Sequence, residues 1–119
     1  LFPEYHTSAD NMEFLKPEAL EKSYKNTLQI IDIMENEYKT VNLAPHGEPN
    51  LGKRGLYGAI GGDKKAYDAN LPVFWMLNQS DGQHSLLDIA QRAKLPYERI
   101  HDAAKVLSEN NLLEVLEAK

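Results

Sequence analysis

The sequence contains no cysteine, no run of about 18 apolar residues and no excess of positive charge. Without cysteine, neither a disulfide framework nor a thiolate metal site can form. Without a long apolar run, no segment is expected to cross a membrane, and no signal-peptide pattern is visible. The net charge of −5 opposes general nucleic-acid binding, because such proteins normally carry a basic surface. We therefore expect a globular, cytoplasmic protein that does not bind membranes.

The length of 119 residues suits one modest domain, or one small domain with the tail of another. The first residue is Leu1 and no start methionine is present, so the sequence is typical of a fragment. Composition divides the chain into three parts, residues 1–40, 41–66 and 67–119.

Residues 1–40 hold eight acidic and four basic residues, a net charge of −4. A proline early in a helix is favourable, so the spacing predicts a helix that begins near Pro17 and runs to Tyr38. Its apolar positions recur at helical spacing: Leu20, Tyr24, Leu28, Ile31 and Met34. One helix cannot form a core, so this face must pack either on the C-terminal part of the chain or on a domain upstream.

Residues 41–66 hold six of the seven glycines and are predicted to be a turn-rich connector. The run Gly47–Arg54 is close to a phosphate-loop pattern, but Arg54 replaces the required hydroxyl and later glycines would break the helix that must follow. Leu51, Leu56 and Tyr57 are expected to dock on a neighbouring part. Lys53 and Arg54 are candidate interaction residues that either bind a carboxylate or keep the loop solvated.

Residues 67–119 show the densest pattern and predict a helix-turn-helix followed by the start of a wing. A helix is expected after Pro72, a turn at Ser80–Gln83, and a capping box formed by Ser85 and Asp88. Asn110 and Asn111 suit a helix end, and residues 112–116 a short strand. Two further helices carry apolar faces at helical spacing: Leu86, Ile89, Ala90 and Ala93, then Ile100, Ala103, Ala104 and Leu107.

The helix that carries Ile100 and Leu107 is a poor match to the recognition helix of a DNA-binding protein. Its polar positions include Glu98, Asp102 and Glu109, and carboxylates oppose the phosphate contacts that supply most non-specific affinity. A protein partner is therefore favoured over DNA. Trp75 is favoured as a core residue over a ligand-binding one, and it is also a candidate interaction residue because part of its helix can serve an interface.

Three runs resemble the C-terminal third of a family of bacterial aminopeptidase-like proteins, which have the zinc-dependent exopeptidase fold and an appended winged helix. The runs are Glu4–Asn11, Gly47–Tyr57 and Asn70–Asn78 with Ser80–Gly82. The resemblance implies a mostly α chain: a helix and glycine-rich loop from the end of a peptidase domain, then a small winged helix-turn-helix of three helices plus short β. The resemblance implies domain boundaries after residues 40 and 66, which are the boundaries that composition suggests.

The resemblance also implies a role for His6, as the last zinc ligand of a two-zinc exopeptidase, with Thr7 and Asp10 supporting its ring. The other ligands and the catalytic glutamate would lie upstream of Leu1. A catalytic zinc needs about three protein ligands, so this chain alone is expected neither to bind zinc tightly nor to be an enzyme. The parent is expected to be a zinc-dependent hydrolase of peptide-like substrates, with its upstream peptidase domain as the partner of this chain. A homo-oligomer is a further possible assembly that the sequence leaves open.

The alternative is a stand-alone winged helix that binds a protein partner, or a transcription regulator that binds DNA. The acidic balance favours the protein partner.

Overall fold

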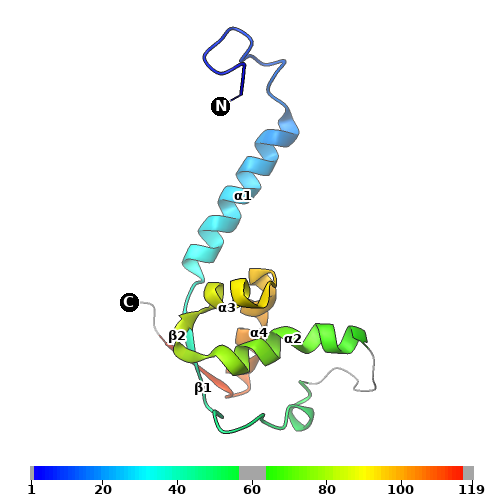
Figure 1. The fold of residues 1–119 in the computed structure, drawn as a ribbon, viewed down its shortest axis with the longest axis vertical. Helices are drawn as coiled ribbons and strands as arrows, with labels where there is room; N and C mark the ends of the chain where they lie inside the picture. The colour runs from blue at the N-terminus through cyan, green and yellow to red at the C-terminus, as the bar shows by residue number, and fades with distance from the viewer. Residues whose placement is uncertain (1, 57–63, 117–119) are drawn as a thin grey trace. The chain divides into compact units, whose positions relative to one another are not determined.

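The structure is a computed structural model that describes residues 2–56 and 64–116, without the side chains of residues 64–67. Figure 1 traces the order of the helices and strands along the chain. The chain separates into two compact units, Leu1–Asn36 and Glu37–Lys119. Each unit is considered by itself.

The first unit consists of a series of turns followed by the helix α1, Pro17–Glu35. Pro17 lies in the first turn of α1, as the sequence predicts, and Asn36 ends the helix by donating its amide to the Asp32 carbonyl. The helix therefore stops three residues before the predicted end at Tyr38. No residue of α1 is buried. Its apolar stripe is exposed at every predicted position: Leu20, Tyr24, Leu28, Ile31 and Met34.

The second unit contains a three-stranded antiparallel sheet in the order β2-β1-β3. The strands are β1 (Lys39–Asn42), β2 (Asp81–Ser85) and β3 (Leu113–Leu116). The central strand thus comes from the beginning of the unit, immediately after α1 in the chain (Figure 1). Thr40 in β1 is fully buried, and its hydroxyl lies 2.7 Å from that of Ser80. The sequence predicts a single short β run, which is the position of β3; the structure adds two strands.

The residues just before β1 belong to the second unit as well. The Leu86 amide donates to the Tyr38 carbonyl, and the Leu87 amide donates to the Glu37 carboxylate at 3.1 Å. These amides would otherwise lack partners at the start of the helix α3, Leu86–Ala93. The structural division between Asn36 and Glu37 therefore differs from the boundaries at 40 and 66 that composition suggests.

The helix α2 spans Lys64–Gln79 and contains Pro72 in its interior. The sequence predicts that this helix begins after Pro72, whereas the structure continues it through the proline. Proline has no amide to donate to the carbonyl four residues earlier, which belongs to Asp68. The guanidinium of Arg99 donates to that carbonyl instead. Arg99 thereby satisfies the backbone group that Pro72 leaves without a helical partner.

Arg99→Ala is expected to destabilise the second unit by about 0.5–1.5 kcal/mol, the usual contribution of one hydrogen bond. In a Pro72→Ala background, residue 72 regains its amide and can donate to Asp68, so the same Arg99→Ala change should cost less. Urea unfolding of both single variants and the double variant measures this coupling. If the two substitutions lower the free energy of unfolding additively, the bond from Arg99 does not compensate for the amide that Pro72 lacks.

The helix α3 and the following helix α4, Tyr97–Glu109, confirm the predicted helix-turn-helix. Both halves of the capping box form between Ser85 and Asp88, an arrangement that contributes about 1 kcal/mol. Lys94 and Asn111 adopt left-handed backbone conformations after the two helices, and the amides of Leu95 and Leu112 donate back into them.

The core of the second unit lies where the three helices meet. The predicted apolar faces of α3 and α4 are buried at every position except Ala93, which is half-buried. Leu51 is also fully buried and lies just before the 3₁₀ helix η1, Gly52–Arg54. Leu51 thus attaches the glycine-rich segment to the core of the second unit, as the sequence predicts. Tyr57 lies outside the described residues. Other buried apolar residues are Met76, Tyr97, Leu112 and Leu113.

Candidate functional site

His6 lies in the series of turns before α1, with its side chain exposed and a left-handed backbone angle φ of 60°. Its ring packs edge-on against Tyr5, with ring centroids 4.1 Å apart. No hydrogen bond from its ring nitrogens reaches any residue that the structure describes. An exposed imidazole with free nitrogens is chemically suited to a zinc ion.

Thr7 and Asp10 shape the turn around His6. The Thr7 hydroxyl donates to the Glu4 carbonyl at 2.7 Å and accepts from the Ala9 amide, while the Asp10 amide donates to the Thr7 carbonyl. The Thr7 side chain is therefore used to fix the turn that presents His6. In residues 2–56 and 64–116, no three His, Asp or Glu side chains gather as a metal cluster.

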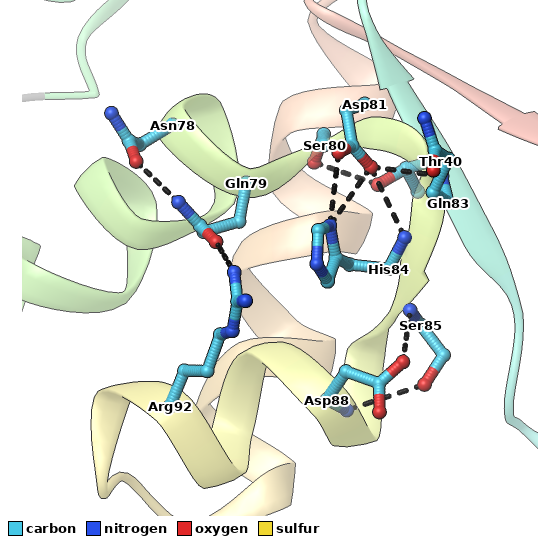
Figure 2. A network of polar contacts seen from close by, with 10 residues as sticks. All are labelled: Thr40, Asn78, Gln79, Ser80, Asp81, Gln83, His84, Ser85, Asp88 and Arg92. Atoms are coloured by element: carbon cyan, nitrogen blue, oxygen red, sulfur yellow. Dashed lines mark hydrogen bonds and ion pairs between the residues drawn. The ribbon is translucent and has the colours of Figure 1, made fainter.

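Asp81 and His84 form a compact polar turn at the start of β2 (Figure 2). Asp81 Oδ1 accepts from the amides of Gln83 and His84 at 2.8 and 3.1 Å, and Asp81 Oδ2 lies 2.9 Å from His84 Nδ1. The amides of Gln83 and His84, with the His84 imidazole, lower the pKa of Asp81 from 3.8 to about 2. The carboxylate thus stays ionised and organises the turn, which occupies one nitrogen of His84.

Arg54 and Lys53 are the charged residues of η1. The Arg54 guanidinium donates to the Asn110 carbonyl at 2.8 Å, at the C-terminal end of α4. A cation there satisfies a terminal carbonyl and complements the helix dipole. The Lys53 side chain is exposed, and only its backbone amide has a described bond, to Asn50.

The arginines of the chain are all engaged within the protein. Arg54 and Arg99 donate to backbone carbonyls, and Arg92 donates to Gln79 Oε1 at 2.6 Å, as Figure 2 shows. A DNA-reading helix normally offers arginines to phosphates and base edges. In this chain the arginines are not available for such contacts. The exposed acidic residues of α4 would also repel phosphates: Glu98, Asp102 and Glu109.

A hollow of about 260 Å³ lies on α2 and is lined by Leu71, Phe74, Trp75 and Asn78. A second, larger hollow of about 450 Å³ shares Phe74 and Asn78 and extends to the loop from Asn42 to Pro49. Asn42 holds this loop in place, because its side chain donates to the Leu77 carbonyl at 2.7 Å and accepts from the Ala44 amide. Trp75 is half-buried here.

The sequence did not reveal the hollows on α2 or the contact between Glu37 and α3. The larger hollow depends on how Asn42 ties the 42–49 loop to the Leu77 carbonyl of α2, and no local pattern encodes that contact between distant residues. The uncharged stretch from Ala69 to Ser80 was the available signal, since a surface helix normally carries charges on its outer face.

Comparison with known proteins divides the chain within one residue of the structural boundary. A family profile described as winged helix-turn-helix matches residues 38–115. Another, described as a domain of unknown function (DUF4910), matches residues 1–37. The first profile thus begins one residue after the start of the second structural unit.

A curated relative and a solved structure, both longer than this chain, come from Clostridium acetobutylicum. One, provisionally named for polysaccharide biosynthesis and for an aminopeptidase-like domain, is 44% identical over 115 residues, which cover 97% of this chain and 26% of that protein. A crystal structure provisionally described as a peptidase matches with a TM-score of 0.82 and 40% identity, covering 97% of this chain and 24% of that one. The chain therefore spans about a quarter of the length of the relatives it matches.

Helices long and apolar enough to cross a membrane are not found among the described residues.

Proposed function

Because the chain belongs to the winged helix-turn-helix family through residues 38–115, we propose that this module is the accessory end of an aminopeptidase-like protein. The observation that carries the proposal is the match to a longer relative across both units, since 97% of this chain aligns with only 26% of a protein named for an aminopeptidase-like domain. Residues 1–36 would be the final part of that hydrolytic domain.

The exposed stripe of α1 supports this assignment. Leu20, Tyr24, Leu28, Ile31 and Met34 lie on one side of the helix, yet nothing within the first unit covers them. Large side chains left in water forgo about 1.5–3 kcal/mol each relative to burial. The rest of a hydrolytic domain in the same polypeptide would bury this stripe and recover that free energy.

His6 would then be one ligand of a zinc ion whose other ligands lie upstream. Its exposed imidazole and the fixed turn around it suit that role, and zinc bound there would activate a water for attack on a peptide-like amide. Thr7 holds the turn and Asp10 is exposed beside it. Within this chain, the role of His6 is to offer its imidazole from a defined backbone position.

His6→Ala in the longer polypeptide is expected to lower zinc content and to reduce hydrolysis of aminoacyl amides by about 100-fold, because a catalytic zinc keeps only about three protein ligands. Zinc per chain and initial rates measure this. His46→Ala is the matched control, because His46 is exposed in the glycine-rich loop and should leave both quantities unchanged. Full zinc content and full activity in the His6 variant would exclude the ligand role.

The second candidate is a module that binds a protein partner independently of hydrolysis. The specific observation in its favour is the uncharged, hollowed face of α2 around Trp75. DNA binding is disfavoured by the engaged arginines and by the acids of α4.

A further inference from the structure

We propose that Phe14 is a positioning residue for His6, and that it acts on the imidazole through Phe2 and Tyr5. The inference rests on the proposed role of His6 as a zinc ligand, and it identifies the part of this chain that sets the direction of the ligand's ring. All four residues lie in the segment before α1, within the first unit (Figure 1).

The hydrogen bonds of this segment are all local. Among the described residues, each hydrogen bond within residues 2–15 joins groups that are no more than four positions apart. The side chains of Thr7 and Asn11 take part by bonding to neighbouring backbone groups. Such bonds define single turns. They do not fix the path of the whole segment, because each turn can still vary with respect to the next.

A row of aromatic rings connects the two ends of the segment with His6. Phe14 stacks on Phe2, with ring centroids 5.3 Å apart and ring planes inclined by 24°. Phe2 meets Tyr5 edge-on with centroids 5.7 Å apart, and Tyr5 meets His6 in the same way at 4.1 Å. Stacked and edge-on pairs are the arrangements that aromatic rings prefer. The pair of Phe2 and Phe14 therefore closes the segment, and Tyr5 links this pair to the imidazole.

The His6 ring depends on this packing because it has no polar partner among the described residues. A zinc-bound histidine usually donates its other ring N–H to a carboxylate or a carbonyl, and that bond sets the ring orientation. In the described part of this chain, the contact with Tyr5 takes the place of such a bond. The backbone of His6 also has a left-handed φ of 60°, an uncommon conformation that persists only when the surrounding structure holds it.

The first test uses the 119-residue chain without metal and follows the ring-proton NMR resonances of His6. The ring current of Tyr5 displaces these resonances from their positions in an unfolded chain. Phe14→Ala is expected to move them back toward those positions, whereas Phe14→Tyr keeps the ring stack and should leave them in place. Leu15→Ala is the matched control, because Leu15 is 43% exposed against 38% for Phe14 and is not an aromatic residue. Unchanged His6 resonances in the Phe14→Ala chain would refute the inference.

The second test measures the zinc affinity of the longer polypeptide by competition with a chelator, and the visible absorption of its cobalt-substituted form. Phe14→Ala is expected to weaken zinc binding by about tenfold or more, because lost support of a ligating histidine costs about 10–100-fold in metal affinity. The cobalt spectrum should change as well, since it reports the geometry of the ligands. Phe14→Tyr and Leu15→Ala are expected to keep the affinity and the spectrum of the unmodified protein.

His6→Ala in the same polypeptide separates this inference from the proposed function. If His6→Ala loses zinc while Phe14→Ala keeps full affinity, His6 remains a ligand and the inference about Phe14 is wrong. If Leu15→Ala weakens zinc binding as much as Phe14→Ala, the loss is a general one and the inference is also wrong. If His6→Ala itself keeps its zinc, the proposed function is wrong, and the His6 resonances alone decide whether Phe14 positions the ring.

Discussion

A chain that begins at Leu43 should fail to fold, whereas a chain that begins at Asn36 should unfold cooperatively. The shorter chain lacks β1, which is the central strand of the sheet and pairs with both β2 and β3. It also lacks the buried Thr40 and the groups before β1 that accept from the first amides of α3. Urea unfolding followed by circular dichroism compares the two chains.

The expected size of this effect follows from how little stability a small domain holds. Native domains are stable by about 5–15 kcal/mol, and removing a central strand exposes two unpaired edges together with the core beneath them. The chain from Asn36 is the matched control, because it lacks the turns and α1 but keeps the whole second unit. A cooperative transition in the chain from Leu43 would show that β1 is dispensable.

Leu86→Ala should destabilise the second unit by about 2–5 kcal/mol, because it removes a fully buried side chain and leaves a cavity at the start of α3. Ile89→Ala, one turn later, should fall in the same range. The free energy of unfolding in urea measures both.

Leu43→Ala is the control of the same residue type, since its side chain is 51% exposed and only its backbone amide is bonded, to the Leu112 carbonyl. It should cost about 0.5 kcal/mol or less. Equal losses at Leu86 and Leu43 would contradict the assigned core face of α3.

The local parts of this fold were predictable from the sequence. Ser85 and Asp88 encode the start of α3 by direct contact between near neighbours, and Asn111 permits the left-handed turn after α4. The apolar faces of both helices follow from spacing alone, so the helix-turn-helix could be assigned without any knowledge of distant contacts.

The missed parts depend on contacts between residues far apart in the sequence. β1 has four residues with one buried, and its identity as a strand comes from partners about 40 and 75 positions later. Asp81 and Gly82 keep the turn geometry that their residue types favour, yet pairing with β1 places them in a strand. Pro72 is tolerated inside α2 because of a bond from Arg99, 27 positions away, which no local rule anticipates.

The candidate sites divide in the same way. His6 could be singled out from its neighbours in the sequence, and its place in an exposed turn is compatible with a ligand role. Arg54 was a candidate interaction residue, but its contact with the Asn110 carbonyl, 56 positions away, shows a structural use that sequence spacing cannot reveal.

The most direct measurement for the central claim is to read the coding sequence upstream of the Leu1 codon. The account predicts an open frame that continues for a few hundred codons, since the matched relatives are about four times as long as the chain, and that encodes further His, Asp and Glu ligands. A start codon immediately before Leu1 would contradict the claim and leave the chain as a stand-alone winged helix.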